Sequence, residues 1–568
     1  MLYWQFQILI LCFLLTGPVM GQVNLWTLTD EQEDDSEGKA IVGTETYKMV
    51  VGGTFKNSFS TGGFSVSVEL PGTSYFLMET DIEGKIYWLK HFASSAEFKV
   101  KKISSDNAHN LFLLAELNGF VTYGNLQIGE ETTNNESLLI KLDAKGNYLW
   151  HKFLKEPGNS KLKIKGFDVS SSGEIFMAVE LKEYVTIEGQ QFVPQGKENI
   201  LLLKFSDTGQ LLQHHQITSP YKVKPEALKI TRTGKIYLSG VFDGKVNFNS
   251  SFSISGKSKQ AFIARLNSNF EAEWAFAKFS GPKGYKIKAI EEDNQQNILV
   301  AGEFEISLLV DETHKVESIS KNADVLLIKF SSAGNILWMH NVNPLDEAEA
   351  KGIKVDKNNN IYLYGEYKQG FRYGYQNENP LVTTCKNASK AKGAFLAKYS
   401  PEGKVMAAKS ISGVNEAKIG DLFIDFKNDL YVTGNYKGSL ALDTVNLLTS
   451  SSQKCFYLAK IDLHSCTFIY DYSQDFINKD VVFLHQNFPN PTSGETYIHF
   501  HVAKEVPVRI QLYDFSGRAV DTVFEEAQTK VANYVFPYIF PDRCSSGIYM
   551  LVLESGDRRL TKKIMLQK

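Results

Sequence analysis

The adjacent residues His214 and His215 are the first place in this sequence to look for acid–base or metal chemistry. They lie in the segment LLQHHQ, whose pattern is that of a β-strand, and neighbouring side chains of a strand point to opposite faces. We therefore interpret the pair as part of the scaffold. The sequence contains no HExxH, GxSxG, P-loop or strand-to-helix GxGxxG motif, and no CxxC or HxxxH spacing suited to zinc. We predict no catalytic residue, no metal site and no cofactor.

Acidic residues recur at fixed places, which favours structural roles for them. One set lies four residues before a strand, where a carboxylate can accept hydrogen bonds in an Asx-type turn; it consists of Asp106, Asp293, Asp356 and Asp425. A calcium site is the alternative, but each aspartate lacks the second and third carboxylates of a calcium loop. A second set occupies equivalent hairpin turns: Asp143, Asp207 and Glu402. Both sets are predicted to be turn residues.

The polar and aromatic segment Gln369–Lys392 is the best candidate for a binding site. Aromatic and arginine side chains are enriched where proteins contact their partners. We predict that a glycan or protein contacts four of its residues: Arg372, Tyr373, Tyr375 and Asn377. A longer solvated loop is the alternative interpretation.

The elements that must position these residues belong to a repeat. Between Lys39 and Ser473 the sequence repeats itself seven times, with a period of about 62 residues. Each copy contains four strand-like runs separated by short turns; in the fourth copy they are ALKIT, KIYLSGVF, QAFIARL and EAEWAFAKF. Four antiparallel strands in each of seven units predict an all-β fold, a seven-bladed β-propeller. The segment Gln369–Lys392 is an insertion in the sixth unit.

Tryptophan recurs at one position of this repeat. Four copies hold it, as Trp88, Trp150, Trp274 and Trp338, and the other copies have Gln213, Ala407 and Ile469 there. A large apolar side chain that returns with the period of the blades is typical of packing between them. We predict a wedge between neighbouring blades rather than a platform for a ligand.

Composition and the N-terminus bear on location. The 568-residue chain has a formal net charge of −3, and its Lys and Arg residues are scattered, which gives no electrostatic reason to expect nucleic acid or an anionic membrane as a partner. The apolar run Ile8–Met20 predicts a secretory signal peptide, with cleavage between Gly21 and Gln22. A membrane anchor is the alternative, but about 13 apolar residues are short for a span. No other segment could cross a bilayer.

Export permits disulfides, and four cysteines follow the predicted signal peptide. In the predicted hairpin Cys466 lies beside the turn, whereas Cys455 lies near the far end of the partner strand. That separation is too large for a bridge. We expect mostly free, buried thiols at Cys385, Cys455, Cys466 and Cys544.

The repeated units share a pattern of the form FIAKxDxxGxxxWxxxF followed by xxDxxxNIYxxGxF. This pattern resembles the SBBP-type β-propeller repeats of secreted bacterial proteins. The resemblance covers about three-quarters of the chain and implies a propeller in an extracellular setting. It implies no particular chemistry.

The last part of the chain no longer follows the repeat. Alternating apolar residues and the turn sequences PNP and SSG predict a small Ig-like β-sandwich in residues 484–568. The motifs NFPNP, LYDFSGRAV and GIY, with the lysine-containing C-terminus, resemble the type A C-terminal sorting domain of the type IX secretion system of Bacteroidota. The resemblance implies docking on the secretion machinery, with these motif residues: Asn490, Pro491, Tyr513, Asp514, Gly517, Arg518, Gly547, Tyr549 and Lys563.

We therefore expect a signal peptide (1–21), an acidic linker (22–38), the propeller (39–473), a second linker (474–483) and the sorting domain (484–568). The leading functional hypothesis is a monomeric secreted or cell-surface protein that passes through the periplasm and binds a glycan or protein partner without catalysis. An extracellular hydrolase or lyase acting on polysaccharide or peptide is the first alternative, because propellers host such sites and a fold does not fix a function. A structural component of the cell surface or motility apparatus is the second.

Overall fold

The computed structural model describes residues 25–568 apart from a set of gaps. The gaps are residues 33, 135, 155–161, 257–258, 280–284, 311–314, 319–321, 345–346, 369, 374–380, 385–391, 414–415, 443–444, 449–452, 464–481, 485–486, 488–489, 491, 503 and 530–531. Every regular element in the described ranges is a β-strand, which confirms the all-β prediction. These ranges contain no helix long and apolar enough to cross a membrane.

Residues 27–463 form a series of antiparallel four-strand groups, in which the first strand pairs with the second, the second with the third and the third with the fourth. The first strands are β2 (Glu37–Glu45), β8 (Glu97–Ser105), β14 (Lys163–Val169), β20 (Lys222–Ile230), β26 (Tyr285–Glu292), β32 (Ala348–Val355) and β38 (Glu416–Ile424). The second strands are β3 (Lys48–Phe55), β9 (Leu111–Asn118), β15 (Ile175–Leu181), β21 (Ile236–Asp243), β27 (Ile298–Glu305), β33 (Ile361–Lys368) and β39 (Leu430–Lys437).

The third and fourth strands complete each group. The third strands are β6 (Ser74–Asp81), β12 (Glu136–Leu142), β18 (Asn199–Phe205), β24 (Gln260–Leu266), β30 (Ala323–Phe330), β36 (Lys392–Tyr399) and β42 (Cys455–Ile461). The fourth strands are β7 (Ile86–Ser94), β13 (Tyr148–Phe153), β19 (Leu211–Ile217), β25 (Ala272–Phe276), β31 (Ile336–Pro344), β37 (Val405–Gly413) and, for the last group, β1 (Thr27–Thr29).

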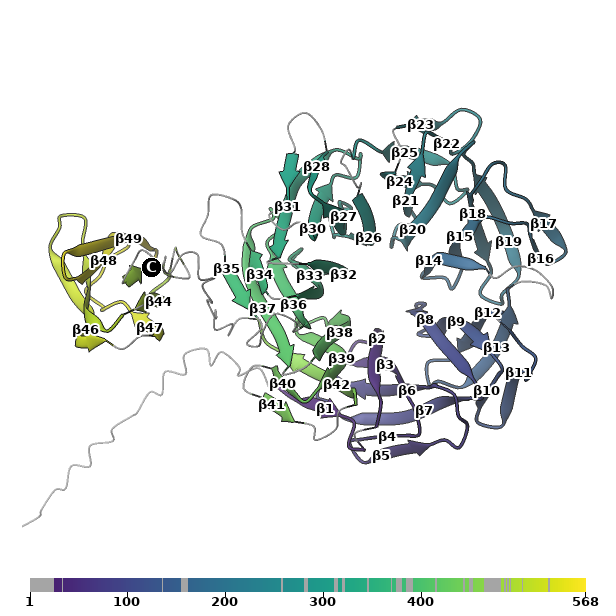
Figure 1. The fold of residues 1–568 in the computed structure, drawn as a ribbon, viewed down its shortest axis with the longest axis horizontal. Coiled ribbons are helices and arrows are strands. Elements are labelled where there is room, and N and C mark those ends of the chain that lie inside the picture. The colour runs from purple at the N-terminus through teal and green to yellow at the C-terminus, as the bar shows by residue number, and fades with distance from the viewer. Residues whose placement is uncertain are drawn as a thin grey trace, which may run out of the picture.

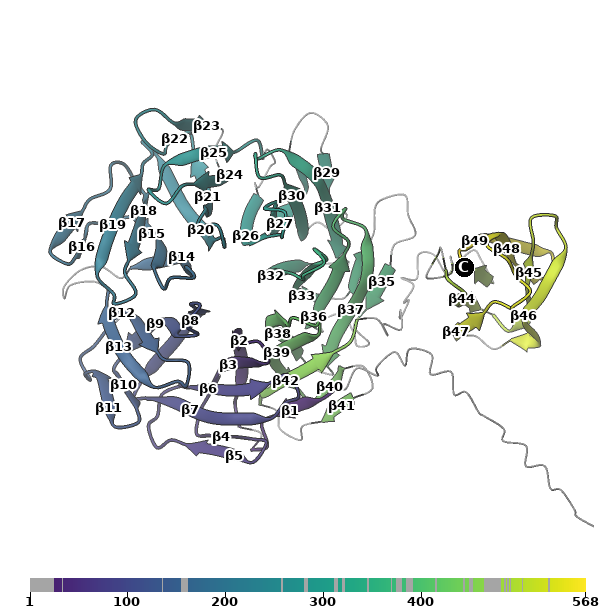
Figure 2. The same ribbon diagram turned by 180° about the vertical axis from the view of Figure 1, so that it is seen from behind.

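The groups follow one another around a common centre, with the first strand of each group nearest to it (Figures 1 and 2). Successive first strands contact each other, and so do the last and the first, β38 and β2. The series therefore closes on itself, which places one strand of every group along the inner surface.

The apolar core lies in layers between neighbouring groups. One layer contains Phe176 and Leu202 from one group together with Leu238 and Phe262 from the next. Because a second or third strand is covered on both faces, its sequence is a nearly continuous apolar run rather than an alternating one. Strand β18, for example, reads NILLLKF and has only one residue that is not buried.

The recurrent tryptophans lie between neighbouring groups, as predicted. Three of the four indole nitrogens donate to a backbone carbonyl in the next group's turn between third and fourth strands: Trp150 to Asp207 (3.2 Å), Trp274 to Ser332 (3.0 Å) and Trp338 to Pro401 (3.1 Å). The ring of Trp88 lies against Gly146 of the corresponding turn, but its indole nitrogen has no hydrogen-bond partner among the described residues. The turn needs a glycine to admit the ring. At Gly209, which has a φ of +82°, an added Cβ would lie 3.1 Å from a ring carbon of Trp150.

Strand β1 brings Trp26 to the corresponding place in the last group. It pairs antiparallel with β42, and the Trp26 indole donates to the Ile82 carbonyl at 3.1 Å, in the turn of the first group. This differs from the sequence expectation, which treated 22–38 as a linker and aligned Ile469 with the tryptophans. Ile469 lies outside the described residues. A strand of three residues at the opposite end of the chain from its group leaves no signal in a repeat alignment.

Each group also carries a hairpin between its second and third strands, which the four predicted runs per unit omitted. The hairpins are β4 (Ser58–Thr61) with β5 (Phe64–Ser67), β10 (Phe120–Tyr123) with β11 (Leu126–Gly129), β16 (Val185–Ile187) with β17 (Gln190–Phe192), β22 (Lys245–Asn247) with β23 (Ser253–Ser255), β28 (Ser307–Leu309) with β29 (Lys315–Glu317), β34 (Gly370–Tyr373) with β35 (Leu381–Thr384) and β40 (Ser439–Leu442) with β41 (Val445–Leu448). Strands of three or four residues are too short to show a periodic pattern. The segment 369–392 is thus a longer version of a hairpin that all groups have.

The C-terminal module has two sheets. One contains β43 (Val482–Leu484), β44 (Glu495–Val502) and β47 (Ala532–Ile539), and the other β46 (Ala519–Thr529), β45 (Val506–Tyr513), β48 (Gly547–Ser555) and β49 (Arg558–Leu566). Apolar residues of both sheets share one core, which includes Ile498 and Phe500 from the first sheet and Leu512 and Leu551 from the second. The module therefore has a core of its own.

Two of the four cysteines can be placed. Cys455 and Cys544 are free and buried, as predicted. Cys385 and Cys466 lie outside the described residues. A thiol buried in apolar surroundings is chemically inert.

Candidate functional site

The adjacent histidines contact different parts of the structure. The Nε2 atom of His214 lies 2.8 Å from the side-chain nitrogen of Gln190 in β17, whereas Nε2 of His215 lies 2.5 Å from the carbonyl oxygen of Phe248 in the next group. The two rings thus point away from each other, as expected for neighbours in strand β19. Each has a scaffold partner of its own.

The recurrent aspartates close turns, as predicted. Each carboxylate accepts a hydrogen bond from the backbone N–H four residues later: Asp106 from Asn110 (2.8 Å), Asp293 from Asn297 (2.8 Å), Asp356 from Asn360 (2.8 Å) and Asp425 from Asp429 (2.9 Å). In its hairpin turn Asp143 accepts from the N–H of Asn147 at 2.7 Å. Within the described ranges, no three or more His, Cys, Asp or Glu residues gather where they could hold a metal ion.

Asp293 also forms a buried ion pair with Lys329. The Nζ and Oδ2 atoms lie 2.8 Å apart, and the two side chains are only 4% and 0% exposed. Replacing Asp293 by Asn leaves the Lys329 ammonium buried without a counter-charge. We therefore expect the free energy of unfolding to fall by about 3–5 kcal/mol, measured by urea denaturation. A loss below about 1 kcal/mol, typical of exposed pairs, would contradict this role.

The same pair predicts how stability depends on pH. Burial alone would raise the pKa of Asp293, but hydrogen bonds from Lys329 and Asn297 outweigh burial and lower it. The ionised carboxylate therefore stabilises the fold above the pKa of an unfolded aspartate, about 4, and this contribution is lost as the pH falls through the lower folded pKa. The wild type should lose more stability than Asp293→Asn as the pH falls below about 4. Parallel pH profiles would contradict the prediction.

Two of the four predicted binding residues lie in a described strand. Arg372 and Tyr373 belong to β34, whose backbone pairs with β35 and, at Arg372, with Asn343 of β31. Tyr375 and Asn377 lie outside the described residues. The four residues remain a predicted site on the hairpin of the sixth group.

Charged residues of alternating sign follow the inner strands. Six consecutive first strands contribute one each to what we call the charge belt: Lys102, Asp168, Lys229, Glu291, Lys354 and Asp421. The Lys229 ammonium lies 3.3 Å from Glu291 and 3.9 Å from Asp168. Lys354 lies 3.6 Å from Asp421. A cavity of about 380 Å³ borders the belt at Lys229, Glu291 and Lys354.

The pKa shifts of Asp168 and Lys229, in the belt, favour their charged forms. The Glu291 carboxylate raises the pKa of Lys229, although burial opposes this. Burial would raise the pKa of Asp168, but Lys229 and Lys102 outweigh it and lower the pKa. A general acid or base needs a pKa near the working pH, whereas these two shifts lead away from neutrality.

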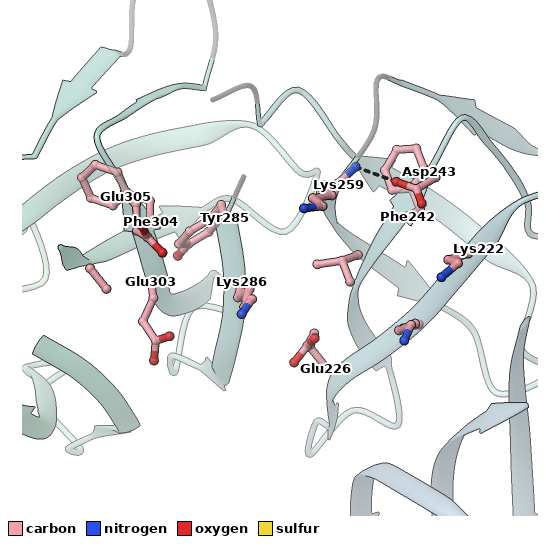
Figure 3. A pocket seen from close by; sticks show the side chains of 13 residues that line it. Lys222, Glu226, Phe242, Asp243, Lys259, Tyr285, Lys286, Glu303, Phe304 and Glu305 are labelled. Carbon is pink, nitrogen blue, oxygen red and sulfur yellow. Dashed lines mark hydrogen bonds between the residues drawn. The ribbon is translucent and has the colours of Figure 1, made fainter. Parts of the chain in front are cut away.

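A pocket of about 670 Å³ opens between the groups that begin with β20 and β26 (Figure 3). Its charged lining includes Lys222, Lys224, Glu226, Lys286 and Glu303. The aromatic lining residues Phe242, Tyr285 and Phe304 are only 2%, 1% and 1% exposed. A ligand in the pocket therefore meets mostly charged side chains. In the view of Figure 3, Lys286 lies between Glu226 and Glu303.

Glu303 stands out among the pocket residues. Its Oε1 atom is buried and has no hydrogen-bond partner among the described residues. Burial raises the pKa of this carboxyl, and Lys288 offsets the effect only in part. Sequence reasoning did not find this pocket. One sequence signal pointed to the pocket. Val241 in β21 occupies the position that corresponds to Glu303 in β27.

The predicted sorting residues hold the C-terminal module together. Asn490 donates to the Lys563 carbonyl at 2.8 Å and accepts from the Met565 N–H at 2.7 Å, which fastens its segment to β49. In the turn between β45 and β46, the Asp514 carboxylate accepts from the Arg518 N–H at 3.1 Å. These hydrogen bonds explain why the module has an amide at position 490 and a carboxylate at position 514.

The remaining motif residues have similar places. Gly517 has a φ of +81° in the same turn, and Gly547 begins β48. The hydroxyl of Tyr549 donates to the Ser545 carbonyl at 2.9 Å, and that of Tyr513 donates to Gln511 at 2.8 Å. Pro491 lies outside the described residues.

Residues 486–567 match the family model of the secretion system C-terminal sorting domain. The match coincides with the predicted sorting domain. The chain is therefore exported through the type IX secretion system, via the periplasm, to the cell surface or the extracellular space. This confirms the predicted location.

Comparisons of the whole chain are weaker. The sequence matches none of the curated proteins to which it was compared. Among solved structures, PorZ of Porphyromonas gingivalis, an essential bacterial surface component of the type IX secretion system, is 11% identical with a TM-score of 0.20, over 94% of this chain and 81% of PorZ. A DUF4221 protein of Bacteroides vulgatus is 12% identical with a TM-score of 0.29, over 64% of this chain and 95% of its own. Synechocystis apocarotenoid oxygenase is 11% identical with a TM-score of 0.33, over 78% and 94%. At such TM-scores these similarities carry no argument about fold or function.

Proposed function

We propose that the four-strand groups of residues 27–463 are the seven blades of a β-propeller built from SBBP-type repeats. The closed series of groups around one centre supports this proposal (Figure 1). Residues 482–566, with two sheets over one core, then form the Ig-like β-sandwich, whose partner is the secretion machinery. On the cell surface the propeller is a monomeric, non-catalytic platform that binds a glycan or protein.

The pocket between the blades of β20 and β26 is the observation that carries this function. Its volume of about 670 Å³ lies within the range of about 300–1,000 Å³ that is typical of ligand sites. It lies where the repeat changes, at Val241, and side chains of both charges line it. The stability of seven similar blades does not require such a pocket, whereas the binding of a ligand requires a place for it.

A binding role agrees with the electrostatics of the charge belt. Asp168 and Lys229 have pKa values displaced away from neutrality, so they neutralise each other rather than exchange protons with a substrate. We therefore interpret the belt as a brace between blades, and the pocket as the place of recognition.

Arrays of glycans and of surface proteins test the binding function. The mature full-length protein should bind at least one ligand at micromolar concentration, and Val241→Trp, which fills the pocket, should weaken binding at least tenfold. Thr54→Trp is the matched control, because Thr54 holds the same strand position in the first blade and should leave binding unchanged. Equal binding by all three proteins would contradict the pocket assignment, and no binding at all would favour a purely structural role at the cell surface.

One observation favours a second candidate, a hydrolase or lyase. Glu303 has a raised pKa and lines the same pocket as Glu226, and two carboxyl groups in one site can serve as acid and base. Release of reducing ends or amines from polysaccharides and peptides measures this activity. We expect none. Release that disappears in Glu303→Gln would establish the enzyme and overturn the non-catalytic proposal.

A further inference from the structure

Glu303 belongs to a set of equivalent positions in the second strands, immediately after the small mid-strand residue. Four blades have a carboxylate there: Glu116, Glu180, Glu303 and Glu366. The other three have Thr54, Val241 and Asn435. The set provides an internal comparison, because the same backbone presents the same carboxylate in several neighbourhoods.

In three of these neighbourhoods a lysine ammonium faces the carboxylate. Lys101 lies 3.0 Å from Glu116, and Lys351 lies 3.6 Å from Glu366. Both lysines are the extra residue of a β-bulge in the first strand of the same blade. Glu180 meets Lys163 and Lys224, each at 3.5 Å. The fold thus has a standard way to satisfy this buried acid, which is a primary ammonium at about 3–4 Å.

The blade of Glu303 departs from this arrangement. Lys288 is the extra residue of the same bulge, but it is exposed and forms no ion pair with Glu303. The Oε1 atom of Glu303 is left without a partner among the described residues and borders the pocket. A buried carboxylate without a partner is costly to the fold unless something else supplies the missing charge. The pocket beside Glu303 provides the space for it.

We propose that this pocket binds a saccharide that carries a primary ammonium, an unacetylated amino sugar, whose amine takes the place of the absent lysine at Glu303. The inference rests on the proposed binding function. A saccharide suits the lining, because most of the lining residues are charged and the three aromatic residues are covered. Lys222, Lys224 and Lys286 are donors for hydroxyl or acidic groups on the same ligand.

Titration calorimetry of the mature full-length protein with a short glucosamine oligomer and its N-acetylated counterpart tests the proposal. Acetylation removes the charge and leaves the ring unchanged. The glucosamine oligomer should bind at least tenfold more tightly, and Glu303→Gln should abolish this preference. Glu116→Gln is the matched control, because it removes the same charge at the same strand position outside the pocket, and it should keep the preference.

Several results would overturn the proposal. They are equal affinity for the two oligomers, an unchanged preference in Glu303→Gln, or binding of a lysine peptide without binding of the glucosamine oligomer. If another ligand then binds in a manner that Val241→Trp disrupts, the binding function stands and only the amine assignment fails. If no saccharide or protein binds, both fail together.

Discussion

Replacing Trp26 by Ala should lower the free energy of unfolding by about 2–3 kcal/mol, because the half-buried indole packs against a buried apolar cluster. Its indole lies between the last and first four-strand groups and donates to the Ile82 carbonyl at 3.1 Å. The loss should exceed that of packing alone, because β1 is also the outer partner of β42. Urea denaturation measures the stability, and hydrogen exchange of the β42 amides measures opening of the seam.

Two comparisons make the Trp26 prediction specific. Trp150→Ala removes an equivalent tryptophan from the middle of the series of groups, so it should cost similar stability without faster exchange in β42. Tyr184→Ala removes an aromatic ring that is 53% exposed and should change stability by less than about 0.5 kcal/mol. If Trp26→Ala matches Tyr184→Ala in unfolding free energy and in exchange of the β42 amides, Trp26 does not stabilise the contact between the last and first groups.

Removal of residues 484–568 should leave the protein in the periplasm and abolish its appearance at the surface. The sorting-domain match covers residues 486–567, and this module has a core separate from those of the four-strand groups. The truncated protein should therefore remain folded while it is retained. Cell fractionation with immunoblotting measures the location, and resistance of the retained protein to protease verifies its fold.

A milder variant tests whether export depends on the stability of the module. Asn490→Ala removes the two hydrogen bonds that fasten the NFPNP segment to β49. It should reduce export in proportion to the loss of module stability. Surface display of the truncated protein at wild-type levels would show that export does not use this domain.

The periodic parts of the fold were predictable from sequence, and the exceptions were not. Strands such as β21 carry continuous apolar runs of seven or eight residues, and the turn aspartates recur with them. In contrast β1 has three residues, and its group lies at the other end of the chain. The hairpins are equally short. The local sequence of such segments does not differ from that of loops. They become strands only because they pair with the edge of a neighbouring strand.

Among the functional residues, too, those that recur with the repeat were easier to predict than those that depart from it. The charge belt could have been found in the repeat alignment, since Glu291 and Lys354 each lie two residues before a turn aspartate. The pocket gave a weaker signal, the single substitution at Val241, because its shape depends on how two four-strand groups pack. The sequence search favoured the longest departure from the repeat, at 369–392, whereas the pocket arises from a substitution that changes no length.

A crystal structure of the mature protein with its best array ligand tests the central claim most directly. The proposed function predicts ligand density between β20 and β27, within hydrogen-bonding distance of the pocket lysines or of Glu303. Density on the β34–β35 hairpin instead would restore the site predicted from sequence and contradict the pocket. Density along the charge belt, with a cleaved ligand, would contradict the non-catalytic platform.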